Sequence, residues 1–234
     1  MGITRYRLRD AGGGVAPALG VAEQPAPQTA ARVEVTAGED SVSLPAEPAA
    51  GLDWQGLEQA VANCCACGLC KTRRNTVFGV GDREAELMII GEAPGAEEDR
   101  QGEPFVGRAG ELLNNMLAAI GLARDKVYIA NILKCRPPGN RNPSVEEATA
   151  CAPFLQRQLE LVAPKVVLAV GGVAAHNLLA TDESVGRLRK RLHRLPGSEV
   201  PVMVTYHPAY LLRRPEEKAK SWADLQNLHR FLHE

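Results

Sequence analysis

The feature that most constrains the fold of this chain is a series of four short apolar runs separated by longer amphipathic segments. Runs of this length without polar alternation are typical of strands buried on both faces. Strands that alternate with helices pair in parallel, and the helices cover both faces of the sheet. The sequence therefore predicts an α/β fold, a three-layer α/β/α sandwich with a central, mainly parallel four-stranded sheet. The expected strands are 86–90, 127–130, 165–170 and 200–206.

Helix signals occupy the segments between these runs. Asp53 is a capping residue at the start of one amphipathic pattern, and Ser144 with Glu147 three residues later forms a capping box at the start of another. Gly121 marks the end of a third pattern. The first expected helix begins at Asp53. The others span 109–120, 145–162, 173–180 and 215–232.

The first 52 residues differ in composition from the rest of the chain. Residues 11–50 contain no aromatic residue and no sustained apolar period. Such a composition cannot offset an ordering entropy of about 1 to 2 kcal/mol per residue. We expect a flexible Ala/Pro/Gly-rich leader over 1–52, with or without a partner-binding motif, and one folded domain over 53–234.

Charge and hydropathy limit the surfaces that the chain can offer. The 27 Lys and Arg residues nearly balance the 28 Asp and Glu residues, so a nucleic-acid surface has to be a local patch. No apolar run approaches the roughly 18 residues needed to span a bilayer. The N-terminus also lacks the apolar segment of an export signal. We expect a cytoplasmic monomer without membrane association.

Polar side chains follow three of the four expected strands. Glu92 comes after the first strand, Asn131 after the second and His207 after the fourth, while two glycines follow the third. Ligands of open α/β sheets bind beyond the carboxyl ends of the strands, so these side chains are expected in one crevice. Each of them alone is better explained by a structural role. Their joint position is what indicates function.

Four longer motifs carry a resemblance to a known family over residues 62–232. They resemble, in matching order, the motifs of the family 4 uracil-DNA glycosylases, the iron–sulfur branch of the uracil-DNA glycosylase superfamily. Several multi-residue motifs in series are specific, whereas an isolated His-Pro pair is not. The motifs are Gly91–Gly95, Pro104–Gly107, Asn131–Pro138 and His207–Leu212.

The resemblance implies that a flipped uracil occupies the crevice. Phe105 would stack on the base, and Asn131 would read its amide edge, because an amide group offers both an acceptor and donors to uracil N3–H and O4. Gly91 and Ala93 would complete the substrate-binding set. His207 would donate to uracil O2 as the glycosidic bond breaks.

Glu92 is the candidate catalytic carboxylate, which would orient the attacking water or shape the pocket. Other branches of the superfamily place an acidic or amide side chain one position later, where this chain has Ala93. The resemblance therefore leaves the water-activating group open.

The six cysteines form a group of four near residue 67 and two single residues further along. In a cytoplasmic chain this pattern indicates a metal site or cluster rather than disulfides. The first group allows two registers, Cys64 with Cys67 or Cys67 with Cys70. The resemblance implies a [4Fe–4S] cluster with a structural role on Cys64, Cys67, Cys135 and Cys151.

A basic segment precedes the His207 motif, and we predict that it forms a strand or hairpin arm that contacts phosphate. A solvated charged arm is the alternative. Leu211 is predicted to be a wedge that fills the gap left by the flipped nucleotide, with core packing as its alternative. The expected DNA contacts are Arg187, Arg189, Lys190, Arg191, Leu211 and Arg213.

The prediction for the whole chain is a monofunctional glycosylase that hydrolyses the bond between uracil and deoxyribose in DNA. No lysine is evidently placed for strand cleavage. Two alternatives remain, a uracil-DNA binding protein that forms a covalent adduct and an iron–sulfur redox or sensor protein. The first is disfavoured because residues 136–143 contain no histidine. The second leaves Phe105, Asn131 and His207 without a purpose.

Overall fold

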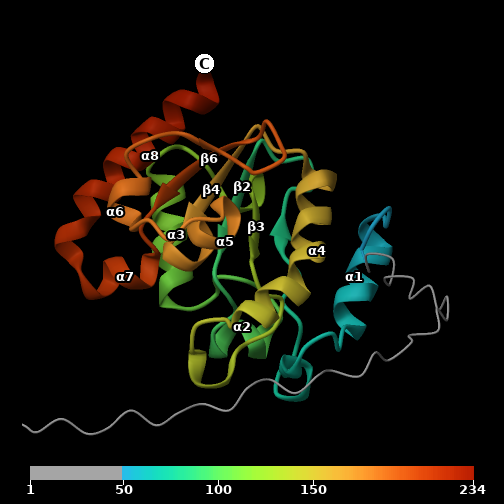
Figure 1. Ribbon diagram of the computed structural model, residues 1–234. Helices are drawn as coiled ribbons and strands as arrows, with labels where there is room; N and C mark the ends of the chain where they lie inside the picture. The colour runs from blue at the N-terminus through green and yellow to red at the C-terminus, as the bar shows by residue number, and fades with distance from the viewer. Residues whose placement is uncertain (1–48) are drawn as a thin grey trace, which may run out of the picture. The chain divides into compact units, whose positions relative to one another are not determined.

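The computed structural model describes residues 49–234, and its centre is a six-stranded sheet (Figure 1). The strands are β1 (Val80–Gly81), β2 (Leu87–Gly91), β3 (Tyr128–Asn131), β4 (Val166–Val170), β5 (His193–Arg194) and β6 (Pro201–Thr205). Four of them run parallel in the order β3-β2-β4-β6. The short strands β1 and β5 pair antiparallel with β3 and β6 at the two edges. The α/β class and the parallel centre are confirmed, and the sheet has two strands more than predicted.

Eight helices accompany the sheet in the described part of the chain. They are α1 (Trp54–Asn63), α2 (Ala96–Gln101), α3 (Arg108–Ala118), α4 (Val145–Val162), α5 (Gly172–Leu179), α6 (Val185–Leu188), α7 (Pro208–Arg213) and α8 (Lys218–His233). Short 3-10 turns lie at η1 (Gly68–Lys71), η2 (Arg124–Lys126), η3 (Pro138–Asn140) and η4 (Pro215–Glu217).

The side chains of the central strands alternate between two apolar clusters on opposite faces of the sheet. Leu87 and Ile89 of β2 belong to a cluster with α3, α7 and α8. Met88 and Ile90 belong to a cluster with α4, α5 and α6. Figure 1 shows α3, α7 and α8 on one side of the sheet and α4 on the other. The predicted three-layer sandwich is therefore the observed architecture.

Capping residues set the helix boundaries as the sequence predicts. The Asp53 carboxylate accepts a hydrogen bond from the Gly56 N–H at 2.8 Å at the start of α1. At the start of α4, the Glu147 carboxylate accepts from the Ser144 N–H at 2.9 Å, and the Ser144 hydroxyl accepts from the Glu147 N–H at 3.3 Å. Each cap satisfies backbone donors that a helix leaves free at its N-terminus.

Three short helices were not predicted, and two of them change the interpretation of a motif. Residues 96–101 form α2, and the segment after His207, for which no helix was predicted, forms α7. The basic segment is mostly α6 and a turn, and only His193–Arg194 is strand. Helices of four to six residues lack enough turns to show a periodic apolar pattern. The last helix begins at Lys218, after the 3-10 turn η4.

The predicted leader, residues 1–52, lies outside the described residues except for its last four. Of those four, Ala49 is buried in a cluster with Leu57 and Val61 of α1. Within residues 49–234 no helix combines the length and the apolar character needed to cross a membrane.

Candidate active site and cysteine cavity

The predicted substrate residues meet in one cavity at the carboxyl ends of the parallel strands. Its volume is about 440 Å³. Phe105, Asn131 and His207 all line it, although they come from three separate segments of the chain. Glu92 and Ala93 line it as well. The expected convergence on one crevice is therefore present in the structure.

Asn131 is the last residue of β3 and is buried, with 2% of its surface exposed. Its side-chain Oδ1 has no hydrogen-bond partner among the described residues. Leaving a buried acceptor unpaired costs about 1 to 3 kcal/mol. A ligand N–H group that donates to such an unpaired oxygen removes this cost. The hydrogen bond therefore contributes more binding free energy than one to an oxygen that already has a partner.

Gly91 explains how the amide and the aromatic ring fit side by side. A Cβ atom on Gly91 would lie 2.4 Å from Asn131 Oδ1 and 2.6 Å from Phe105 Cζ. Any side chain at this position would displace both groups. Gly91 does not itself line the cavity. It was predicted as a substrate-binding residue, and its role in the structure is to leave space for the Asn131 and Phe105 side chains.

Phe105 is held in a strained backbone conformation, with φ at +53°. A non-glycine residue in this region costs of order 1 to 3 kcal/mol and persists only where the surroundings impose it. Arg124 imposes it from one side, donating to the Pro104 carbonyl at 2.5 Å and to the Phe105 carbonyl at 3.3 Å. The Glu98 carboxylate of α2 accepts from the Val106 N–H at 3.1 Å on the other. Neither Arg124 nor Glu98 was predicted, since only tertiary structure brings them to the loop.

The Phe105 ring has two roles in the structure. It is buried in the apolar cluster of α3, α7 and α8, and it also lines the cavity. Its centroid lies 5.6 Å from the His207 ring, with 30° between the planes. The ring is thus fixed by the core on one side and faces the cavity beside the imidazole.

His207 caps the N-terminus of α7, and this contact sets its tautomer. Its Nδ1 atom accepts a hydrogen bond from the Ala209 N–H at 3.1 Å. The neutral ring therefore carries its proton on Nε2. The pKa of His207 is lowered to about 4, chiefly by burial and to a smaller extent by the Arg213 charge, while the Glu98 charge opposes the change. At neutral pH the residue is an uncharged hydrogen-bond donor.

Glu92 is a half-buried carboxylate on the same cavity wall. Burial raises the pKa of Glu92 above its ordinary value. A raised pKa makes a carboxylate a better proton acceptor near neutral pH than an exposed one.

A second, smaller cavity is lined by cysteines. Cys64, Cys67, Cys135 and Cys151 line it, and Cys65 and Cys70 do not. Of the two registers that the sequence leaves open, the geometry thus favours Cys64 with Cys67. Within residues 49–234, no three or more His, Cys, Asp or Glu side chains are grouped closely enough to hold a single metal ion.

Donors surround the sulfur atoms of this cysteine cavity. Arg73 Nη1 lies 3.0 Å from Cys135 Sγ, and the Lys134 backbone N–H donates to Cys151 Sγ at 3.3 Å. Burial raises the pKa of the Cys151 thiol to about 11, and the charge and the backbone N–H of Lys134 oppose this rise. Donors and cations favour thiolates, which are the form that binds metal.

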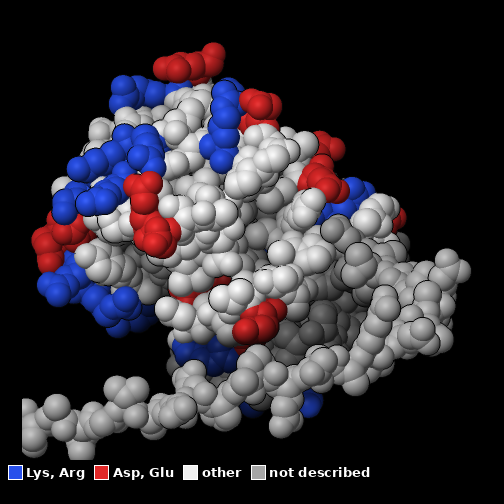
Figure 2. Space-filling view, viewed as in Figure 1, with Lys and Arg blue, Asp and Glu red and all other residues white. Residues whose placement is uncertain are grey.

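The predicted DNA contacts separate into two groups. Arg187, Lys190 and Arg191 are exposed, although Arg191 pairs with Glu183 at 2.5 Å. Arg213 lines the substrate cavity. Figure 2 shows lysine and arginine side chains gathered on the side of the molecule where α6 and α7 lie in Figure 1. A local basic patch is therefore present despite the balanced total charge.

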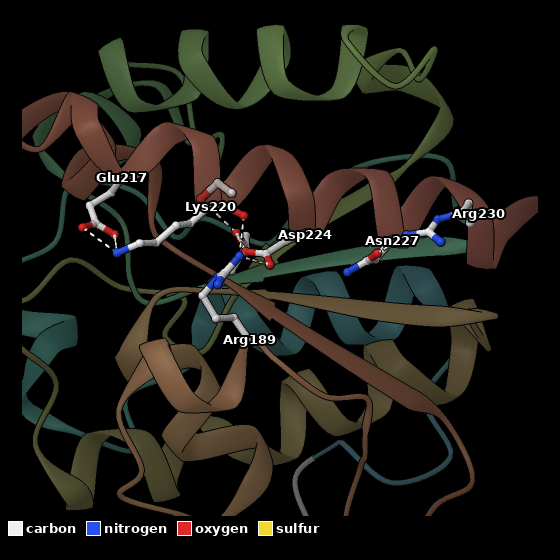
Figure 3. A network of polar contacts seen from close by, with 8 residues as sticks. Arg189, Glu217, Lys220, Asp224, Asn227 and Arg230 are labelled. Atoms are coloured by element: carbon white, nitrogen blue, oxygen red, sulfur yellow. Dashed lines mark hydrogen bonds and ion pairs between the residues drawn. The ribbon is translucent and has the colours of Figure 1, made fainter.

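Arg189 and Leu211 have other roles than the ones we predicted. The Arg189 side chain is only 12% exposed and binds the Asp224 carboxylate of α8 through two nitrogens, at 2.9 and 2.6 Å (Figure 3). It is a structural cation and not a phosphate ligand. Leu211 is 1% exposed in the core, because α7 turns it toward the sheet, so it is not a wedge. Its neighbour Leu212 is the exposed leucine of α7.

Comparison with known proteins places the chain in a class. The chain belongs to the uracil DNA glycosylase superfamily, whose family model matches residues 78–226. This region includes the substrate cavity and two of the four cysteines of the cysteine cavity.

Several relatives that are at least 40% identical to this chain are type-4 uracil-DNA glycosylases. The type-4 uracil-DNA glycosylase of Archaeoglobus fulgidus is 44% identical over 178 residues, which cover 74% of this chain and 89% of the relative. The type-4 enzyme of Pyrobaculum aerophilum is 40% identical and covers 77% and 98%. The type-4 enzyme of Thermotoga maritima is 42% identical and covers 67% and 82%.

Proposed function

We propose that this chain is a monofunctional uracil-DNA glycosylase, which flips uracil out of DNA and hydrolyses its bond to deoxyribose. The observation that carries the proposal is the free acceptor of Asn131, buried in a cavity beside the Phe105 ring and the His207 imidazole. An unpaired amide oxygen next to an aromatic face suits a planar base that presents an N–H group.

Base recognition follows from the chemistry of these two side chains. The extruded base stacks on Phe105, a contact of about 1 to 3 kcal/mol, which is comparable with the cost of extrusion. The Asn131 Oδ1 atom accepts from uracil N3–H, and its amide NH₂ donates to uracil O4. Cytosine presents an acceptor at N3 and a donor at C4, so it leaves the amide oxygen unpaired. The site therefore selects uracil.

Bond cleavage is driven by charge stabilisation on the leaving base. As the bond between C1′ and N1 breaks, its electron pair moves onto the base and collects at O2. The Nε2–H group of neutral His207 donates to that oxygen, a contribution commonly worth a factor of about 100 to 1000 in rate. Water then adds to C1′ of the oxocarbenium-like sugar. Glu92 accepts the water's proton, and the uracil anion is protonated on release.

We propose that Cys64, Cys67, Cys135 and Cys151 hold a [4Fe–4S] cluster. Their position around one cavity, with Arg73 and Lys134 as donors, supports a set of four thiolates. When bound, the cluster supplies cross-links between distant segments of the chain rather than redox chemistry. Its ligands flank Asn131 and the loop 136–142, so it would stiffen one wall of the substrate cavity.

One assay tests the function against its alternatives. The protein is incubated with a uracil-containing oligonucleotide, and free uracil, abasic DNA and covalent adduct are separated. Release of uracil with turnover, without strand cleavage, supports the proposal. A heat-stable adduct would support the binding protein, and inertness together with a bleachable visible absorbance would support the sensor. We further propose that the protein is cytoplasmic and monomeric. Size-exclusion chromatography with light scattering tests the oligomeric state.

A further inference from the structure

Lys134 is a buried lysine that lies between the two cavities and has no carboxylate partner. It is 1% exposed, and none of the ion pairs among residues 49–234 includes it. Its Nζ atom donates to the backbone carbonyl of Asn131 at 2.9 Å and to Gln158 Oε1 at 2.6 Å. Burying an ammonium group with only neutral acceptors costs desolvation free energy. A nearby anion would offset this cost.

Gln158 fixes this lysine in place. Its Nε2 atom donates to the Phe78 carbonyl at 2.9 Å and to the Tyr128 hydroxyl at 3.1 Å. Gln158 is itself fully buried on α4, the helix that carries Cys151. The Nζ position is therefore set by the packing of α4 against the end of β3.

The other end of Lys134 belongs to the cysteine cavity. Its backbone N–H donates to Cys151 Sγ at 3.3 Å, and the residue lines the cavity together with Cys135. The thiols of Cys135 and Cys151 are the groups of potential negative charge that act electrostatically on the Lys134 ammonium group, without a direct contact to Nζ. As thiolates of a cluster they would supply the anion that the buried cation lacks.

We propose that Lys134 is a positioning residue that couples the cysteine cavity to the base-reading amide. Its charge neutralises the cluster thiolates, and its Nζ hydrogen bond holds the carbonyl of Asn131 so that the amide stays aimed into the substrate cavity. Only the part that concerns Asn131 and catalysis rests on the proposed glycosylase function. Lys134 touches neither base nor sugar in this arrangement and acts through Asn131.

The test compares Lys134→Met with Lys71→Met in the full chain purified with its cluster. Lys71 is an exposed lysine of η1, close in sequence to Cys67 and Cys70, and serves as the matched control. Outer-shell partners of metal ligands typically change metal affinity or activity by about 10- to 100-fold. We expect Lys134→Met to lose iron to a chelator about 10- to 100-fold faster than the unaltered chain, and Lys71→Met to stay within about twofold.

The catalytic half has a separate readout. In iron-loaded Lys134→Met, kcat on uracil-containing DNA should fall about 10-fold, while the affinity for DNA carrying an uncleavable abasic analogue stays within about twofold. Equal iron loss in the two variants would overturn the charge role. A fall in DNA affinity as large as the fall in kcat would overturn the positioning role. If the unaltered chain releases no uracil, the proposed function fails while the iron measurement still decides on the charge role.

Hydrogen exchange on the unaltered chain covers the case that Lys134→Met does not fold. Iron is removed with a chelator, and amide exchange is compared before and after. We expect residues 128–134 to lose protection, while β4 at the sheet centre keeps it. Unchanged protection of 128–134 would show that the cysteine cavity and Asn131 are not coupled, and would sink the proposal.

Discussion

Two buried polar groups of this molecule, the Asp224 carboxylate and the Asn131 amide, are treated in opposite ways. Both Asp224 oxygens accept hydrogen bonds from Arg189, at 2.6 and 2.9 Å (Figure 3). One of them also accepts from the Thr205 hydroxyl at 2.8 Å. The Asn131 oxygen has no partner in the described part of the chain. The Asp224 carboxylate is satisfied within the fold, whereas under the proposed function the Asn131 oxygen is free to accept from the base.

The two groups also lie at the ends of different strands of the same sheet. Thr205 ends β6, two residues before His207, and its Oγ1 atom accepts a hydrogen bond from the Ser221 hydroxyl at 3.1 Å. Asn131 ends β3. Burial raises the pKa of Asp224, and the Arg189 guanidinium opposes this rise. The satisfied network thus fixes the strand that presents the imidazole, and the unsatisfied amide faces the cavity.

The largest expected effect is on the free energy of unfolding, and it comes from the Asp224 network. Asp224→Ala leaves the Arg189 cation buried without a partner, which should destabilise the protein by about 3 to 5 kcal/mol. Chemical denaturation measures this, with Asn227→Ala, an exposed position on the same helix, expected to stay within about 0.5 kcal/mol. At a temperature where Asp224→Ala is folded, its kcat should change less than about threefold. A loss below about 1 kcal/mol would contradict the comparison.

His207→Ala should have the converse effect, on rate more than on stability. Removing the donor to O2 should lower kcat about 100- to 1000-fold, and losing the cap of α7 should cost only about 1 kcal/mol of stability. Single-turnover kinetics and binding to an uncleavable abasic analogue measure the two terms. The control is His229→Ala, an exposed histidine on α8 that should keep full activity. If DNA affinity fell as steeply as kcat, His207 would be a binding residue.

Asn131→Asp should change the choice of base. A carboxylate lacks the donor for O4 of uracil and accepts from the amino group of cytosine. The ratio of uracil to cytosine excision should fall about 10- to 100-fold, which corresponds to about 1 to 3 kcal/mol for one mismatched polar contact. Matched oligonucleotides measure the ratio. Asn142→Asp adds a carboxylate to the same cavity away from the strand end, and an equal effect there would contradict the role of Asn131.

Residues whose role depends on the strand pattern were predictable from the sequence. Parallel strands bring their carboxyl ends together, so Glu92, Asn131 and His207 were expected in one crevice before any coordinates. The cysteine register needed either the family resemblance or the cavity. Arg124, Glu98 and Lys134 were not predictable, because each acts through a backbone carbonyl or N–H group that only the folded chain brings within reach.

Errors arose where one pattern fits two structures. Arg189 lies among exposed cations, and only the packing of α8 turns it inward to Asp224. Leu211 lies within the His207–Leu212 motif, for which no helix was predicted, and the short helix α7 places it in the core. A segment of six residues gives too little periodicity to distinguish a helix from a loop.

The low pKa of His207 predicts how stability depends on pH. Its folded value of about 4 is below the ordinary 6.5, so the unfolded chain binds more protons in that range and stability falls as the pH falls from about 7 towards 4. Between pH 7.5 and pH 5.5 this group should account for a loss of about 1 kcal/mol. Denaturation at both pH values compares the unaltered chain with His207→Asn, which does not titrate. Equal losses in the two proteins would refute the shift.

The smallest expected effect distinguishes two arginines that are two residues apart. Arg187 is exposed and belongs to none of the ion pairs among residues 49–234, whereas Arg189 is bound to Asp224. Arg187→Ala should weaken DNA binding about two- to fivefold, independently of sequence, and lower the slope of log affinity against log salt by about 1, since one phosphate contact is lost. Arg189→Ala should lower stability and leave the salt slope unchanged. Equal salt slopes in both variants would show that the solvent exposure of the arginine side chain does not determine which one binds phosphate.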